Sequence, residues 1–195
     1  KLTDLRKRIS KKLEANITKE LEELNMKNVV FKINFDRHDY FTAEGLDKIE
    51  FLISTNKGEE LKPLSKIVSG GEMARIMLAF KKILSQYDNI PTLIFDEIDT
   101  GISGRTAQIV GEKIKSISKN HQVICISHLP QIAALADVHF LISKEVFDDK
   151  TCVAVKKLDY NERIDELSRL LGGVNLTNTT KLHAKEMLDM SKSLN

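Results

Sequence analysis

The feature that most constrains the fold is an alternation of short apolar strands and amphipathic helices through the middle of the chain. Strands that are joined through helices pair in parallel, with the helices on the faces of the sheet. We therefore predict an α/β fold with a largely parallel sheet flanked by helices, whose functional edge lies at the C-terminal ends of the strands. The predicted series is a helix over 71–87, a strand over Thr92–Phe95, a helix over Gly104–Ser118, a strand over Gln122–Ser127, a short helix over Pro130–Ala136 and a strand over Val138–Ser143.

The segments on either side follow other periods. From Leu2 to Leu24, apolar residues recur at three- and four-residue steps among charged residues. This period is typical both of a coiled-coil arm and of a surface helix packed on its own domain, and both interpretations stay open. Val29–Phe35 and Ile49–Ser54 are rich in β-branched and aromatic residues and predict an antiparallel strand pair. Toward the C-terminal end we predict an edge strand over Cys152–Leu158 and helices over Asp159–Leu171 and Thr177–Met190.

The composition fits one globular domain with helical additions. At 195 residues and 42% hydrophobic residues the chain can build a core, and its longest apolar runs, Ile90–Phe95 and Val123–Ile126, are too short to cross a bilayer. Thirty Lys and Arg against 28 Asp and Glu neither require nor exclude nucleic acid. Cys125 and Cys152 lack CxxC spacing, so we expect neither zinc nor a disulfide framework, and their sparse use fits the cytoplasm. The chain starts at Lys1 without Met or a secretory signal, so we expect it to begin inside a longer protein.

Two adjacent carboxylates, Asp96 and Glu97, follow the apolar strand Thr92–Phe95. At the C-terminal edge of a buried strand, one carboxylate can hold Mg²⁺ while its neighbour orients a water that attacks a nucleotide γ-phosphate. Acidic residues after a core strand are also common as the polar start of a loop. The pair alone therefore leaves both interpretations open.

A second candidate site is Ser69-Gly70-Gly71-Glu72 at the start of a predicted helix. Two glycines there leave backbone N–H groups uncovered, and the helix dipole favours an anion. Ser69 can act as the helix N-cap or as a phosphate donor. The apolar residues that follow at helical spacing are predicted to be core: Met73, Ile76, Met77, Phe80, Ile83 and Leu84.

His128 follows the next strand, one crossover after Asp96 and Glu97. In a right-handed βαβ unit these strand ends lie side by side or one strand apart, so His128 and Glu97 can face the same phosphate. A lone histidine is more often structural, but its position in step with the carboxylates favours a function. The remaining histidines, His38, His121, His139 and His183, are predicted to be surface or packing residues.

In this order, the segments resemble the second half of an ABC-type ATPase. The resemblance implies that Ser69–Glu72 is the signature motif that binds ATP in trans, that Asp96 is the Walker B metal ligand, and that Glu97 is the catalytic glutamate. It also makes His128 the catalytic switch histidine. Val68 stands where many signature motifs carry Leu, which is a conservative change. The loop after the acidic pair would be the D-loop, with Asp99, Gly101 and Ser103 as its candidate residues.

Within the ABC ATPases, the residues of these motifs are similar to those of SMC-like proteins that act in bacterial double-strand-break repair. The resemblance covers nearly the whole chain and is carried by Phe95–Gly104, Ser127–Ala134, Leu24–Met26 and Arg163–Gly173. The chain contains no GxxxxGK[ST] motif to cradle the β- and γ-phosphates. The resemblance implies that this Walker A motif lies in an N-terminal lobe, across a long coiled coil. Residues 1–27 would then be the returning arm and residues 28–195 the C-terminal lobe of the head.

The mechanism implied by the resemblance is ATP-driven dimerisation of heads. Ser69, Gly70 and Gly71 would contact the ATP of a second, identical head, with Mg²⁺ as cofactor, while the isolated chain is expected to bind no appreciable ATP. The resemblance implies that DNA is a partner and that the protein acts at the nucleoid, not at a membrane. A basic cluster on the first predicted helix could contact DNA, but it fits a solvated helix face equally well: Lys7, Arg8, Lys11 and Lys12. A DEAD-type helicase leaves Ser69–Glu72 unexplained. A non-enzymatic dimerisation or adaptor module remains the alternative.

Overall fold

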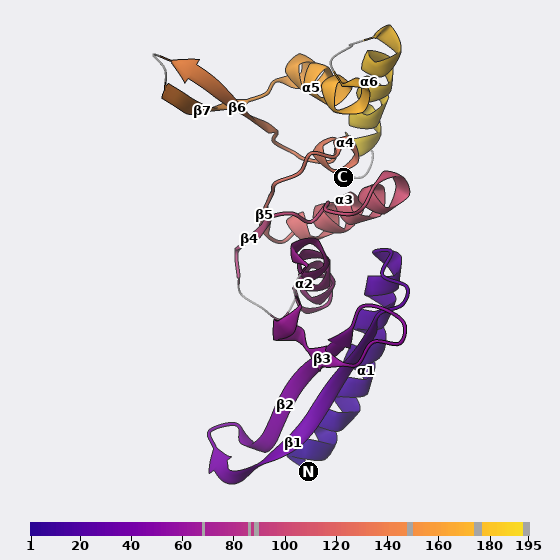
Figure 1. The fold of residues 1–195 in the computed structure, drawn as a ribbon, viewed down its shortest axis with the longest axis vertical. Helices are drawn as coiled ribbons and strands as arrows, with labels where there is room; N and C mark the ends of the chain where they lie inside the picture. The colour runs from indigo at the N-terminus through magenta and orange to yellow at the C-terminus, as the bar shows by residue number, and fades with distance from the viewer. Residues whose placement is uncertain (68, 86, 88–89, 148–149, 174–176, 193–195) are drawn as a thin grey trace. The chain divides into compact units, whose positions relative to one another are not determined.

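The computed structural model describes residues 1–67, 69–85, 87, 90–147, 150–173 and 177–192. Val68 therefore lies outside the described residues. The chain forms two compact units, the first made of Lys1–Ile102 with Ser116–Ile126, and the second of Ser103–Lys115 with Ser127–Asn195. Figure 1 labels their elements. Among the described residues, no helix combines the length and the apolar character needed to cross a bilayer.

The first unit begins with helix α1 (Leu2–Glu23), which runs along a long hairpin of β1 (Val30–Thr42) and β2 (Gly45–Ser54) (Figure 1). The two strands pair antiparallel from Val30 opposite Ser54 to Arg37 opposite Asp47. The predicted strand pair is confirmed, and it extends well beyond the predicted ends. A short strand β3 (Lys62–Pro63) and a 3₁₀ turn η1 (Leu64–Lys66) lead from the hairpin toward the next helix.

Helix α1 buries apolar side chains only in its C-terminal half. Ile17, Leu21 and the C-cap residue Leu24 have no exposed surface, and the helix packs against β1 and against helix α2 (Gly70–Leu84). Leu2 and Ile9, which continue the same apolar spacing, remain 52% and 54% exposed. The surface-helix interpretation therefore holds for the C-terminal half, and the coiled-coil interpretation stays a prediction. The C-terminal half is packed on its own domain, and the N-terminal half exposes an apolar seam.

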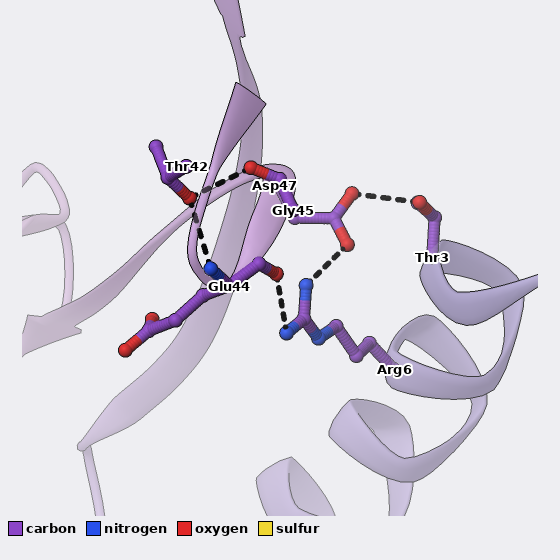
Figure 2. Close-up of polar contacts among 6 residues, drawn as sticks. All are labelled: Thr3, Arg6, Thr42, Glu44, Gly45 and Asp47. Carbon is purple, nitrogen blue, oxygen red and sulfur yellow. Dashed lines mark hydrogen bonds and ion pairs between the residues drawn. The ribbon is translucent and has the colours of Figure 1, made fainter. Parts of the chain in front are cut away.

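A polar clamp fastens the exposed half of α1 to the turn of the hairpin (Figure 2). Arg6 Nη1 lies 2.7 Å from Asp47 Oδ2, and the Thr3 hydroxyl donates to Asp47 Oδ1 at 2.7 Å. Arg6 Nη2 donates to the Glu44 carbonyl at 2.9 Å, and the Thr42 hydroxyl accepts from the Glu44 N–H at 3.2 Å. These hydrogen bonds, first from Arg6 and then from Thr3, lower the pKa of the Asp47 carboxyl below its ordinary value.

The rest of the first unit is helix α2 (Gly70–Leu84) and a parallel strand pair, β4 (Thr92–Phe95) and β5 (Gln122–Cys125). The pair runs in register from Thr92 opposite Gln122 to Phe95 opposite Cys125. An aromatic cluster joins α2 to the hairpin. The ring of Phe80 meets that of Phe31 edge-on at 5.4 Å and that of Phe51 at 5.6 Å.

The buried face of α2 differs from the prediction at one position. Ile76 and Phe80 are buried as predicted, but Met77 is 40% exposed. Leu78 and Ala79 complete the buried face instead. The reason is geometric, because each residue turns about 100° around the helix and the buried residues are centred near Ala79. Leu78 lies about 100° from that centre, at the border of the face, and Met77 lies about 160° away, on the opposite side.

The second unit holds most of α3 (Gly104–Ser118), followed by α4 (Pro130–Ala133) and the strands β6 (Phe140–Phe147) and β7 (Lys150–Lys157). The prediction that Val138–Ser143 continues the parallel sheet is wrong, because β6 pairs antiparallel with β7. Only two residues separate these strands in the sequence, and a parallel pairing needs a crossover of about a dozen residues or more. Within the described residues, parallel pairing is limited to β4 and β5.

Two C-terminal helices complete the second unit, α5 (Tyr160–Gly172) and α6 (Asn178–Lys192), as predicted. A capping box starts α5, since the Asp159 carboxylate accepts from the Glu162 N–H and the Glu162 carboxylate accepts from the Asp159 N–H. The core of this unit is formed by buried residues from α5, α6 and the end of α4: Ala134, Leu167, Ala184 and Leu188. The division into an arm over 1–27 and a lobe over 28–195 stays a prediction.

Candidate functional site

The predicted signature segment forms the N-terminal turn of α2. Ser69 is the N-cap, and its hydroxyl accepts a hydrogen bond from the Glu72 N–H at 3.4 Å. Gly70 and Gly71 follow without side chains, so the N–H groups of this turn have no covering Cβ. Of the two roles open to Ser69, the structure shows the capping role. Ser69 and Gly70 are exposed, as contact with a second molecule requires.

The predicted catalytic carboxylates begin the loop that follows β4, and both are exposed. Glu97 has a backbone φ of 55°, a left-handed conformation that is rare for a residue with a side chain. A tight turn holds it there, because its N–H donates to Asp96 Oδ1 at 2.9 Å and its carbonyl accepts from the Thr100 N–H at 3.0 Å. Such conformations cost about 1–3 kcal/mol and persist where the surrounding structure imposes them.

The two glycines of the signature segment are in direct contact with this acidic loop of the same chain. A Cβ atom on Gly70 would lie 2.3 Å from Glu97 Oε2. A Cβ atom on Gly71 would lie 2.9 Å from the Thr100 Cβ and 3.2 Å from the Glu97 carbonyl oxygen. A side chain on Gly71 is therefore excluded by backbone and Cβ atoms, whereas a side chain on Gly70 would require the Glu97 carboxylate to move away. The sequence predicted an anion site at these glycines, and the structure adds a close approach between the helix start and the loop.

Arg75 is a residue of this site that sequence reasoning missed. It is 7% exposed, and its Nη1 donates to the Thr100 carbonyl at 2.8 Å and to the Ile98 carbonyl at 3.5 Å. Burial lowers the pKa of the Arg75 guanidinium, and the nearby charge of Glu72 opposes this shift. A signal was present in the sequence. Arg75 follows Gly71 by four residues, so a charged side chain stands on the helix face that is otherwise buried.

The predicted D-loop continues from this contact. Asp99 is 4% exposed, and its carbonyl accepts from the Ile102 N–H at 3.3 Å. Gly101 has a φ of 74°, which favours glycine at this position. On the neighbouring strand, burial raises the pKa of the Cys125 thiol to about 12, with smaller contributions from Asp99 and Asp96. The thiol therefore stays protonated, and neither metal binding nor nucleophilic chemistry is expected of it.

The carboxylates of the described residues do not form a metal site by themselves. The described residues contain no group of three or more His, Cys, Asp or Glu side chains that could hold a metal ion. In nucleotide-binding proteins, Mg²⁺ is held by one or two carboxylates together with substrate phosphates and water. The exposed carboxylate of Asp96 at the end of β4 fits that partial role.

His128 belongs to the second unit, whereas Asp96 and Glu97 belong to the first. It is exposed and follows Ser127, whose hydroxyl accepts from the Leu129 N–H at 3.1 Å. The approach of His128 to Glu97 stays a prediction. Behind this segment, Arg163 Nη2 donates to three carbonyls around the end of α4, those of Ala133, Ala134 and Ala136, at 3.4, 3.3 and 2.8 Å.

Three curated relatives match nearly the whole chain, although no family model matches it. The DNA repair protein RecN of Halalkalibacterium halodurans is 45% identical over 197 residues, covering 99% of the chain and 35% of that protein. RecN of Bacillus subtilis is 45% identical, and the match covers 96% of the chain and 35% of that protein. RecN of Vibrio cholerae is 41% identical, and the match covers 96% of the chain and 34% of that protein. The chain belongs to the RecN family. It spans about a third of the length of these RecN proteins, and the predicted resemblance to bacterial repair proteins is confirmed.

Solved structures show the fold that this part of RecN adopts. The Smc head domain of Pyrococcus yayanosii, with a coiled coil and joint, has a TM-score of 0.58 at 21% identity. The match covers 85% of the present chain and 30% of the Pyrococcus yayanosii chain. The Smc head domain of Pyrococcus furiosus, with an extended coiled coil and bound to the C-terminal domain of ScpA, has a TM-score of 0.51 at 22% identity, covering 78% and 36%. The predicted fold, an α/β lobe of an SMC-type head, is confirmed.

Proposed function

We propose that the chain is the C-terminal lobe of an ATP-hydrolysing head that dimerises on ATP and acts in DNA double-strand-break repair. One observation carries the proposal, namely the contact between the first turn of α2 and the loop that bears Asp96 and Glu97. This contact joins an exposed helix N-terminus, suited to a phosphate, to an exposed carboxylate pair at a strand end. Membership of the RecN family and the SMC-type head fold support the same function.

Each predicted site residue has a role in this proposal. Glu97 orients the attacking water, and Asp96 is a ligand of Mg²⁺, which neutralises charge on the phosphates when it is bound. Ser69, Gly70 and Gly71 offer hydroxyl and N–H donors to the γ-phosphate of ATP held by a second head, and Glu72 completes that turn. His128, as the switch histidine, would face the phosphate on which Glu97 of its own head acts. Asp99, Gly101 and Ser103 form the D-loop at the boundary between the heads.

Two exposed apolar surfaces support a proposal for where the rest of the protein binds. Ile94 on β4 is 67% exposed, and its cross-strand partner Ile124 is 46% exposed, whereas Leu93 and Phe95 on the other face are buried. Parallel strands are normally covered on both faces. We assign this face to the N-terminal lobe of the same protein, which would also carry the phosphate-binding loop. The exposed seam of α1 would pair with the other arm of a coiled coil in the same way.

DNA is the proposed substrate of the whole protein, which places it at the nucleoid in the cytoplasm. On α1, Lys7, Arg8, Lys11 and Lys12 are exposed and available to phosphate groups. Lys7 also lies over the ring of Phe35 at 5.8 Å. The cluster therefore stays a candidate for DNA contact and not the observation that carries the proposal.

The test is a Glu97→Gln substitution in the full-length protein. The variant is expected to bind ATP as the wild type does, to accumulate as dimers in the presence of ATP, and to lose turnover, because the amide cannot orient the water as a carboxylate does. Steady-state ATPase assays and light scattering measure these effects. Glu50→Gln, an exposed site on β2, is the matched control and should behave as wild type. Normal hydrolysis by the Glu97→Gln variant would show that the catalytic assignment is wrong.

A further inference from the structure

We propose that Arg75 is a positioning residue that fastens the first turn of α2 to the loop carrying Asp96 and Glu97, so that the two move as one body. The holding role rests on the structure alone. Its consequence for catalysis rests on the proposed function above.

The contacts of the guanidinium support this role. Arg75 Nη1 reaches the Thr100 carbonyl at 2.8 Å and the Ile98 carbonyl at 3.5 Å, and both carbonyls belong to the loop. The side chain is 7% exposed, so water cannot readily replace it as the donor. Both bonds come from one nitrogen, Nη1, of the planar, pre-organised guanidinium, whereas a lysine ammonium is a compact, strongly hydrated point charge on a flexible stem. The residue type is therefore suited to holding a loop backbone in one arrangement.

A second contact lies one helical turn earlier on the same face of α2. Gly71 is buried, and its Cα is so close to the loop that a Cβ would meet the Thr100 side chain at 2.9 Å and the Thr100 carbonyl at 3.0 Å. Thr100 is therefore contacted by two residues four positions apart on the helix: it packs against Gly71 and accepts a hydrogen bond from Arg75. Residues at this spacing share one helix face, so the loop is attached to a rigid element and not to a single flexible side chain.

The attachment has a consequence for a head that works as a dimer. The N-terminal turn of α2 would meet the ATP held by the opposite head, whereas Glu97 would act on the ATP of its own head. Arg75 joins these two parts within one chain. When ATP of the second head fixes the position of α2, the loop with Glu97 is fixed as well. Arg75 thus couples the two ATP sites without contacting either nucleotide.

The experiment compares full-length Arg75→Lys and Arg75→Met proteins with the wild type. Arg37→Lys, at an exposed position on β1, is the matched control. Hydrogen exchange of residues 97–102 is measured in each protein without nucleotide, and ATPase kinetics are measured alongside. We expect exchange in this loop to accelerate by roughly tenfold in both Arg75 variants, because its attachment to the helix is lost. We also expect kcat to fall by roughly ten- to a hundredfold with KM for ATP within about twofold of wild type.

The outcomes separate the two claims. Unchanged exchange in the Arg75→Lys protein, whatever its activity, would overturn the positioning role. Faster exchange with unchanged kcat would overturn the coupling to catalysis. Faster exchange in a protein whose wild type hydrolyses no ATP would support the holding role and contradict the proposed function instead. Arg75→Lys keeps the charge and most of the packing, so the test stands even if Arg75→Met does not fold.

Discussion

Two arginines of the first unit, Arg6 and Arg75, each fasten a helix to a segment far along the sequence, in different surroundings. The Arg6 side chain is 28% exposed and pairs with the Asp47 carboxylate and the Glu44 carbonyl (Figure 2). Arg75 is 7% exposed and donates to the carbonyls of Thr100 and Ile98. One clamp is a partly buried ion pair, in which the Asp47 side chain is 9% exposed, and the other is a buried charge bonded to backbone.

The difference indicates what each clamp can do. Water and salt still reach the partly exposed Arg6 side chain, so we expect the Arg6 clamp to contribute less to stability than the Arg75 clamp and mainly to align α1 with the hairpin. A buried clamp cannot be released without leaving carbonyl oxygens unpaired, which costs about 1–3 kcal/mol for each group. The more rigid clamp lies beside Glu97, whose left-handed backbone needs a fixed loop. We therefore expect the loop at the candidate site to be held more firmly than the N-terminal half of α1.

The largest expected effect on stability is that of Arg75→Met. The methionine keeps the apolar stem but provides no donor to the loop, so we expect the free energy of unfolding to fall by about 2–3 kcal/mol. Urea denaturation followed by circular dichroism measures the change. Arg37→Met is the control at an exposed position and should change little. Equal effects at the two positions would remove the basis for the comparison.

A smaller effect is expected from Gly71→Ala. The added methyl would meet the Thr100 side chain and two backbone carbonyls at 2.9–3.2 Å, and we expect a loss of about 1–3 kcal/mol. Gly70→Ala is the contrasting variant, since its methyl would meet the end of the Glu97 side chain, which can rotate away. It should destabilise less, as measured by the same denaturation. A larger loss for Gly70→Ala would contradict the close contact described for Gly71.

The smallest effect is expected at the Arg6 clamp, and it depends on pH. Because the pKa of Asp47 is lowered by folding, its contribution is present above its unfolded value of about 3.8 and is lost as the pH falls through the lowered pKa. Asp47→Asn should therefore differ from wild type by a small, constant amount between about pH 5 and 8. The difference should shrink below about pH 4. A difference that grows toward acid pH would contradict the assignment.

Where local pattern decides structure, the sequence was sufficient. The ends of β4 and of α3 agree with prediction because an apolar strand and a helix of clear period are bounded by polar or glycine residues. The pairing of β6 was predicted wrongly, since an apolar strand shows the same pattern whether its partner is parallel or antiparallel. A short connection to β7 decides the matter.

The candidate site was predictable in its residues but not in its contacts. Spacing and resemblance located Ser69 through Glu72 and the acidic pair. Neither showed that Gly70 lies against the Glu97 side chain, because that contact joins residues 27 positions apart. The partners of Arg75 were missed for the same reason, since they are backbone carbonyls, although its charge on the buried face of α2 was a signal in the sequence.

The central claim is that Ser69 of one head and Glu97 of another complete a single ATP site. The most direct test mixes two inactive full-length variants, Ser69→Arg and Glu97→Gln, and measures ATP turnover. A mixed dimer contains one site with both native residues, so an equal mixture that is combined before ATP is added, and whose subunits pair at random, should recover about a quarter of wild-type turnover. Recovery at that level is the predicted result. A mixture no more active than the separate variants would contradict the shared site and place Ser69 and Glu97 in the same head's reaction.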